Sequence, residues 1–198
     1  TGKELLLEKT TFDFIARDSM RIIDRITTLT ATGTEVKMPD TKEGMFAIRV
    51  ARQLELPSQE EVTLTDAAGN ATTVPQLSNE GVTGNYLSSE GVQGDSVWGK
   101  KARWMNLFGE INGVKVSLVI CDHPQNPGYP TFWHARGYGL FSANPLGAED
   151  FTQSQQTMNF SIPANQSATF RYRLIITSAK HPGNKEINTL ADEFGRKY

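Results

Sequence analysis

Residues 120–140 hold most of the side chains in this sequence that could do chemistry. Asp122, His123, His134 and Arg136 all lie there, between two apolar runs. Histidine titrates near neutral pH, so His123 or His134 could act as a general acid or base, with Asp122 as a carboxylate partner. The guanidinium of Arg136 could bind a carboxylate or stabilise an enolate. The loop between the two histidines is stiffened by Pro124, Pro127 and Pro130.

Alternation along the chain predicts which of these side chains point together. His134, Arg136 and Tyr138 occupy every second position, so a strand would turn them to one face and Trp133 to the other. A row of His, Arg and Tyr suits a ligand better than a core. Trp133 and Tyr138 are the aromatic residues that could stack on sugar rings.

The same segment also admits a structural interpretation. Asp122 would then cap the loop, His123 would bond to the backbone, and Trp133 would be core. A metal is a further option, because two histidines and a carboxylate can form an open metal site. The spacing of His123, His134 and Asp122 matches no diagnostic motif, so the cofactor stays unknown, with a divalent metal as an option. No phosphate-binding loop, nucleophile elbow, CxxC pair or dinucleotide fingerprint occurs in the sequence.

A second polar cluster precedes the apolar stretch that starts at Met45. Lys42 and Glu43 come just before a predicted strand, where Lys42 could bind an anionic group and Glu43 could act as a carboxylate acid or base. A short polar segment of this kind is also a common solvated turn. Arg171 and Arg173 share one face of a predicted strand. They could line the same polar surface, and exposed cross-strand salt bridges are the alternative that we favour.

Most of the secondary structure predicted around these residues consists of strands. Apolar β-branched and aromatic residues alternate with polar ones in the two-residue period of half-buried strands. Strands are predicted at Leu5 to Ile15, Met20 to Ala31, Met45 to Leu56, Glu61 to Thr65, Ala102 to Glu110, Val114 to Cys121, Trp133 to Ser142, Thr157 to Ile162 and Ala168 to Thr177. Residues 75–99 lack this period and predict a long surface excursion.

Turn and cap residues organise the predicted strands. Asn112-Gly113 predicts a tight hairpin, because both residues tolerate the positive φ angles that such a turn requires. Residues 161–166 predict a second hairpin before the last strand. Near the end of the chain, apolar residues at helical spacing predict one amphipathic helix after the cap Asn184, namely Ile187, Leu190, Ala191 and Phe194. His181, in the turn before it, is expected to face solvent.

Composition bounds the class of protein. With 198 residues and 38% hydrophobic content, one domain spanning 1–198 is the default. The net charge of -2 argues against nucleic acid and anionic membrane surfaces as partners. The single cysteine, Cys121, has apolar neighbours and is expected to be a buried thiol. No apolar run could span a bilayer, so we expect no membrane insertion. The polar start is no signal peptide, so we expect this chain to be a mature or truncated form if the protein is exported.

Three separated motifs carry a family resemblance. They are residues 40–50, residues 102–106, and the segment from Asp122-His123-Pro124 to Phe141. In this order they resemble DUF6807, a bacterial family of unknown function that has also carried a methane-oxygenase-like label. That label does not fit, because the membrane oxygenase it refers to consists of transmembrane helices. The resemblance covers nearly the whole chain.

The resemblance implies a secreted or periplasmic protein with a β-rich fold. Longer members look as though they have an additional N-terminal portion with a His-rich motif, which this chain lacks. If that portion completes the pocket, this chain holds only part of a site. Carried over residue by residue, it points to Lys42, Glu43, Asp122, His123, Trp133, His134 and Arg136. The expected fold is an all-β antiparallel sandwich with one C-terminal α-helix, a galactose-mutarotase-like supersandwich being one form of it.

These observations lead to three functional hypotheses. The first is an enzyme acting on a carbohydrate or sugar acid, by hydrolysis, elimination or epimerisation, with His123, His134, Glu43 and Asp122 as catalytic candidates. Its substrate would be bound by Lys42, Arg136, Trp133 and Tyr138. The second is a non-catalytic carbohydrate-binding sandwich, for which Trp104 joins Trp133 and Tyr138 as a stacking platform. The third is a structural domain with a rigid loop. The ligand would be a small molecule or an oligosaccharide, and the oligomeric state stays open.

Overall fold

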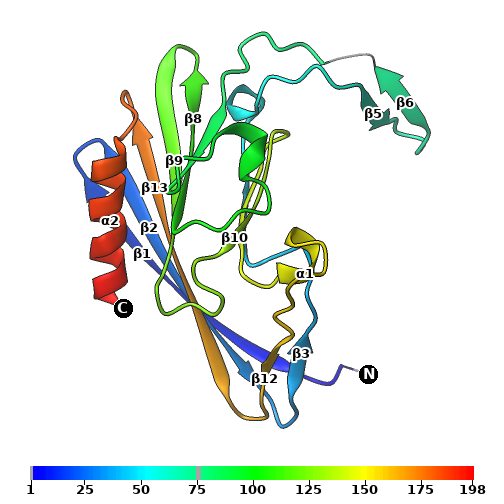
Figure 1. Ribbon diagram of the computed structural model, residues 1–198, viewed down its shortest axis with the longest axis vertical. Helices are drawn as coiled ribbons and strands as arrows, with labels where there is room; N and C mark the ends of the chain where they lie inside the picture. The colour runs from blue at the N-terminus through cyan, green and yellow to red at the C-terminus, as the bar shows by residue number, and fades with distance from the viewer. Residues whose placement is uncertain (1, 75–76) are drawn as a thin grey trace.

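Six antiparallel strands form the larger sheet of the protein. The computed structural model describes residues 2–74 and 77–198. The order across this sheet is β1-β2-β13-β9-β8-β7. The bounds are Leu6–Arg17 for β1, Met20–Ala31 for β2, Ser167–Ser178 for β13, Val114–Asp122 for β9, Trp104–Ile111 for β8 and Asn85–Ser88 for β7. The long strands β1, β2 and β13 cross the whole molecule in Figure 1.

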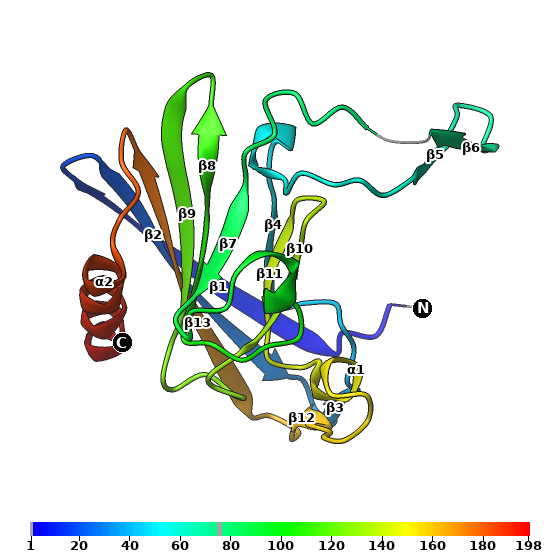
Figure 2. The same ribbon diagram turned by 45° about the horizontal axis from the view of Figure 1, so that its top comes forward.

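A three-stranded sheet covers part of one face of the larger sheet. Its order is β10-β11-β4, with bounds Phe132–Arg136, Leu140–Asn144 and Phe46–Arg49. Two small sheets pair β12 (Phe160–Ile162) with β3 (Val36–Met38), and β5 (Val62–Thr65) with β6 (Ala71–Val74). The β5–β6 hairpin stands away from the two main sheets in both views (Figures 1 and 2).

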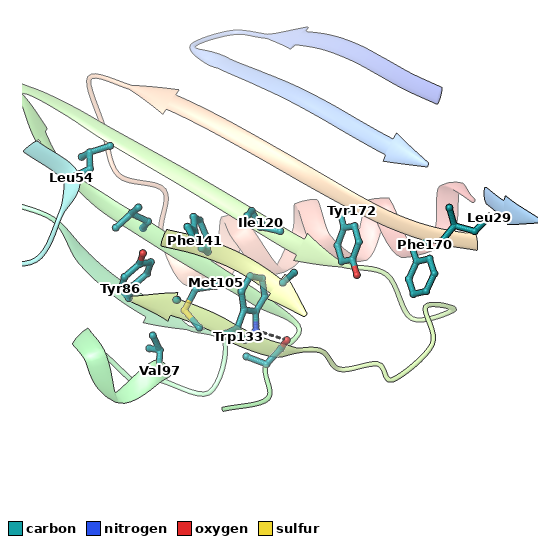
Figure 3. Packing of buried hydrophobic residues seen from close by; sticks show 14 of the residues in the cluster. Leu29, Leu54, Tyr86, Val97, Met105, Ile120, Trp133, Phe141, Phe170 and Tyr172 are labelled. Carbon is teal, nitrogen blue, oxygen red and sulfur yellow. Dashed lines mark hydrogen bonds between the residues drawn. The ribbon is translucent and has the colours of Figure 1, made fainter. Parts of the chain in front are cut away.

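The core lies between the two main sheets. Large side chains from both layers are buried there without solvent contact, among them Trp133, Tyr86, Phe141, Phe170 and Tyr172. Figure 3 shows these rings between the strands, with the hydrogen bond of the Trp133 indole drawn to its acceptor. Burial of such rings contributes most of the favourable free energy of folding. The predicted antiparallel β-sandwich is therefore confirmed.

A C-terminal helix covers the other face of the larger sheet. Helix α2 (Asn184–Lys197) places Ile187, Leu190, Ala191 and Phe194 against Trp104, Val119 and Ile175. The predicted helix is confirmed, but its N-cap is Gly183 rather than Asn184. In Figure 2 this helix lies beside the sheet, on the side opposite the β5–β6 hairpin.

Several predicted strand boundaries were wrong because turns interrupt the alternation. The prediction from Trp133 to Ser142 is two strands, β10 and β11, joined by a turn at residues 137–139. The prediction from Met45 to Leu56 is the short β4, followed by the 3₁₀ turn η1 (Arg52–Leu54). The Asn112-Gly113 hairpin is confirmed, with φ angles of 51° and 75°.

Two topological predictions were also wrong. The turn at residues 163–166 does not join two paired strands, because β12 pairs with β3 and β13 with β2 and β9. The predicted excursion at residues 75–99 contains regular structure in its described part: β7, and a second 3₁₀ turn, η2 (Gly94–Val97). Pro75 and Gln76 lie outside the described residues. One short helix, α1 (Ala148–Phe151), was not predicted.

Within residues 2–74 and 77–198, no helix is both long enough and apolar enough to span a membrane.

Candidate ligand-binding site

The hairpin β10–β11 presents a polar outer face to the elements around it. Trp133 and Ala135 point into the core, so His134 and Arg136 point outward, as the alternation predicts. The register places His134 opposite Ser142 and Arg136 opposite Leu140, with Arg49 beyond it on β4. This outer face is the surface on which the predicted polar row lies.

Residues 99–102 run beside β10 and bring an unpredicted aromatic residue onto this face. The Gly99 amide donates to the Trp133 carbonyl at 2.9 Å, and the Trp133 amide donates to the Lys100 carbonyl at 3.1 Å. Trp98 therefore lies over the outer face. Its ring is 6.5 Å from the His134 ring and 4.3 Å from the Arg136 guanidinium carbon.

His134 is held in one tautomer by the chain that precedes β4. Its Nδ1 lies 2.8 Å from the Lys42 carbonyl, which only accepts, so Nδ1 carries the proton and Nε2 keeps its lone pair. Nε2 has no hydrogen-bond partner in the described part of the chain. Burial lowers the pKa of His134, while the bond to Lys42 and the charge of Glu43 oppose this shift. A neutral imidazole with a free Nε2 is the form of a general base.

The loop that carries Lys42 and Glu43 is fixed to the same face by its backbone. Besides the His134 contact, the Ser142 hydroxyl donates to the Gly44 carbonyl at 2.6 Å. The Lys42 amide donates to Asp150 at 2.5 Å. Both the Lys42 and the Glu43 side chains are exposed. The structure thus brings four of the predicted residues together: Lys42, Glu43, His134 and Arg136.

Arg136 stacks on Trp98 at the edge of an open cleft. The buried Nε of Arg136 has no hydrogen-bond partner, and the side chain forms no ion pair with any described residue. Such a guanidinium, stacked on an indole and not neutralised, is suited to bind a planar anion such as a carboxylate. Arg136 is therefore the strongest ligand-binding candidate of the predicted set.

The cleft has a volume of about 720 Å³. Its lining comes from the β10–β11 turn, η1 with the residues that follow it, and η2; it includes Arg52, Glu55, Asp95, Arg136, Gly137 and Tyr138. The Arg52 guanidinium is ion-paired with Glu55. Tyr138 is 55% exposed, and the guanidinium carbon of Arg49 lies 5.4 Å from its ring centre. This volume and this mixture of aromatic and charged groups are typical of a site for a small polar ligand.

Gly137 lies where two walls of the cleft approach each other closely. Its amide donates to Asp95 Oδ1 at 2.8 Å, and its carbonyl accepts from the Leu56 amide at 2.9 Å. A Cβ at this position would lie 3.0 Å from both Asp95 oxygens. The close approach fixes the two walls of the cleft to each other.

Asp122 and His123 occupy a different place in the fold, between β9 and α2. Asp122 accepts bonds from the His123 amide, the Asn126 side chain and the Thr131 amide, at 3.0, 2.8 and 2.8 Å. It organises the proline-rich loop, and burial raises its pKa to about 7. His123 is fully buried, accepts from the Gln125 amide through Nδ1, and packs edge-on against Phe194. These contacts correspond to the structural interpretation of this pair.

Trp133 and Trp104 are core residues in this fold. Each is no more than 1% exposed, and the Trp133 indole donates to the Ala102 carbonyl at 3.0 Å. A stacking platform needs exposed ring faces. Of the three aromatic residues named for such a platform, only Tyr138 offers one.

Three further expectations concern residues outside the cleft. Arg173 was expected to be exposed, and this was wrong: it is 3% exposed and forms a two-bond ion pair with Asp24. His181 does not simply face solvent, since its Nδ1 lies 2.9 Å from the Ser117 hydroxyl. Cys121 is buried, as predicted.

The described residues do not bring metal ligands together. In residues 2–74 and 77–198, no group of three or more His, Cys, Asp and Glu side chains could hold a metal ion. His123 packs under α2, and His134 lies under Trp98 and Phe151. The metal option built on His123, His134 and Asp122 thus has no geometric support.

Sequence reasoning missed four residues of the site: Trp98, Asp95, Arg52 and Glu55. All lie in or next to short 3₁₀ turns, whose side chains follow neither the strand nor the helix period. A signal was present, because Trp98 is an isolated tryptophan in an otherwise polar segment. Such a residue in a long connection is often placed by contacts elsewhere in the fold.

The fold and the cleft together define an antiparallel β-sandwich with a polar cleft at the end of its smaller sheet. The chain belongs to DUF6807, a family of unknown function, whose model matches residues 1–192. No curated protein and no solved structure matches the chain significantly.

Proposed function

We propose that this protein is a carbohydrate-binding β-sandwich whose cleft takes an oligosaccharide that carries carboxylate groups. The observation that carries the proposal is Arg136, which enters the cleft stacked on Trp98 and without an ion pair among the described residues. Arg52 lines the same cleft but is already paired with Glu55. Arg136 is therefore the lining cation that can take a ligand carboxylate without first losing a partner.

Aromatic and polar groups beside Arg136 support a sugar as the ligand. The exposed Tyr138 ring lies at the mouth of the cleft, where a pyranose could stack on it. Glu55 and Asp95 can accept hydrogen bonds from sugar hydroxyls. The secreted or periplasmic location that the family resemblance implies fits such a ligand, and we propose it on that ground alone.

A catalytic role is the second candidate, and His134 favours it. Its Nδ1 is fixed by the Lys42 carbonyl and its Nε2 is free, with Glu43 near enough to influence its charge. Lys42 could bind an anionic substrate group beside it. However, His134 is only 3% exposed and does not line the cleft. Binding needs no rearrangement of this face, whereas catalysis by His134 needs access to Nε2, so we place binding first.

Calorimetric titration with oligosaccharides tests the proposal. Oligogalacturonides and alginate oligomers are compared with neutral xylo- and cello-oligosaccharides. We expect an acidic oligomer to bind, and Arg136→Gln and Tyr138→Ala each to weaken binding about tenfold, since each removes a central contact. Arg17→Gln is the matched control, because Arg17 is an exposed arginine paired with Glu193 and outside the cleft.

Two outcomes would contradict the binding proposal. One is the absence of binding to every acidic and neutral oligomer. The other is acidic-oligomer binding that Arg136→Gln leaves unchanged. Release of shorter or unsaturated products, lost in His134→Gln but retained in Arg17→Gln, would instead establish the catalytic candidate.

A further inference from the structure

The outermost strand of the larger sheet is long, apolar and open along one edge. β1 pairs with β2 over its full length, from Leu6 to Arg17, and has no second neighbour among the described strands. Among the side chains that the structure describes, six large hydrophobic ones are exposed, and four of these lie on or just before β1: Leu5, Leu7, Phe12 and Phe14. An unpaired edge of this length is a template for pairing with another chain, and clustered exposed apolar side chains mark an interaction site.

The two faces of β1 differ in character. Phe12 and Phe14 point to the side of the smaller sheet, where their rings stack at 6.2 Å and are 52% and 73% exposed. Lys9, Thr11 and Asp13 alternate with them and point to the side of α2. Lys9 has no ion-pair partner among the described residues. Asp13 bonds Lys197 and Tyr198 through Oδ2 only, so its Oδ1 stays available.

We propose that β1 is the interface of a symmetric dimer, in which the β1 strands of two copies pair antiparallel about a two-fold axis through Thr11. This register sets Lys9 of each copy opposite Asp13 of the other, so two opposite-charge pairs form on the α2 side. With the axis one residue earlier, at Thr10, Asp13 would face Leu7. With the axis at Phe12, Lys9 would face Ile15, and with the axis at Asp13 the two aspartates would face each other.

The aromatic face supports the same register. Thr10 of one copy lies opposite Phe12 of the other, so the two Phe12 rings become diagonal neighbours at about 7–8 Å, within reach of aromatic contact. The interface joins the two six-stranded sheets into one continuous sheet. It thereby covers both the open backbone edge and part of the exposed apolar side chains.

A single cysteine at the axis gives a direct test. In Thr11→Cys the two thiols would meet at the axis, where Cα atoms of opposed residues are about 4.5–5.5 Å apart, inside the range of a disulfide. The native Cys121 is fully buried and does not compete. We expect mild oxidation to convert this variant to a covalent dimer. Val114→Cys, at an exposed position at the start of β9 and three strands away from β1, should stay monomeric on a denaturing gel.

The charge pairs give an independent test. Light scattering coupled to size exclusion, over a concentration series, measures the dimer dissociation constant. Lys9→Asp is expected to raise it about tenfold, because both copies exchange an attractive pair for a repulsive one. Lys3→Asp, the same change in an exposed residue before β1, is the control and should leave it unchanged.

The two tests can overturn the proposal. If the protein stays monomeric throughout the concentration series, the dimer proposal is wrong, whether the edge of β1 is open or covered by other residues of the same chain. A dimer that Lys9→Asp leaves unchanged, and that Thr11→Cys does not cross-link, would show that the copies meet through a different face.

Discussion

At the scale of single residues, two histidines from one segment have opposite environments. His123 is closed under α2, with an edge-on contact to Phe194 and a bond from the Gln125 amide. His134 is oriented by the Lys42 carbonyl and keeps Nε2 free of protein partners in the described chain. The two environments differ because strand alternation turns each histidine to a particular face and because different elements cover those faces. His134 is therefore the histidine with a chemical role to test.

The charges around His134 should be visible in its titration. Burial lowers the pKa of His134, Glu43 raises it and Arg136 lowers it. Glu43→Gln should therefore lower this pKa further, and Arg136→Gln should raise it, because each change removes the charge that favours or disfavours the imidazolium. Proton–carbon NMR of the histidine ring protons measures both, with His134→Gln to assign the signal.

A control keeps this prediction specific. Glu149 is an exposed acid outside the groups that shift His134, so Glu149→Gln should leave the pKa unchanged. Shifts of the same sign in Glu43→Gln and Arg136→Gln would contradict the arrangement.

At the scale of elements, helix α2 is attached to the sheet by a buried ion pair. Arg173 on β13 bonds both oxygens of Asp24 on β2, at 2.6 and 2.8 Å, and donates to the Leu190 carbonyl of α2 at 3.0 Å. Lys197 and Tyr198 close the end of this network with bonds to Asp24. The pair therefore connects two strands and the helix.

Loss of one partner should destabilise the protein strongly. Asp24→Asn leaves the buried guanidinium uncompensated and should lower the free energy of unfolding by about 3–5 kcal/mol. Arg173→Met leaves Asp24 paired with Lys197 at 3.1 Å and should lower it by less. Urea denaturation followed by circular dichroism measures this. The exposed pair Arg17–Glu193 is the matched control, for which Arg17→Ala should cost at most about 1 kcal/mol.

The double variant separates charge from packing. If Asp24→Leu with Arg173→Met recovers most of the loss, the penalty comes from the unpaired charge. Equal, small effects of the buried and exposed pairs would contradict a buried network.

At the scale of the whole molecule, stability should be graded from the centre of the larger sheet outward. β13 and β9 have neighbours on both sides, and their buried residues face the core on one side and α2 on the other. β5 and β6 pair only with each other in the described structure, and they stand apart in Figure 2. The cleft lies beside the connection to this hairpin, with its other walls from the β10–β11 turn, η1 and η2.

Hydrogen exchange should follow this gradient. Amides of β13 and β9 should exchange only by global unfolding, because local opening would expose the core. Amides of β5 and β6 should exchange orders of magnitude faster, since opening that hairpin disturbs neither main sheet. Mass spectrometry of peptic fragments measures both, and equal protection of the hairpin and β13 would contradict the gradient.

The long strands, the Asn112-Gly113 hairpin, the terminal helix and the shared face of His134 and Arg136 could be predicted from the sequence, whereas the short strands β3, β6 and β7 could not. Alternation, turn chemistry and helical spacing depend on residues that are close in the chain, so they can be read from it. The same local patterns could not place Arg173, whose burial depends on Asp24, 149 residues away in the sequence. Whether a strand face is exposed depends on which other elements pack on it.

The choice of polar residues that form the site depends on contacts between distant parts of the chain. Trp98 reaches Arg136 because residues 99–102 hydrogen-bond beside β10, a pairing that no local pattern encodes. Asp122 and His123 were separated from His134 because one end of the segment lies under α2 and the other under Trp98. Ion pairs, burial and free lone pairs are set by such long-range contacts, and these contacts made the cleft at Arg136, rather than the two histidines, the candidate site.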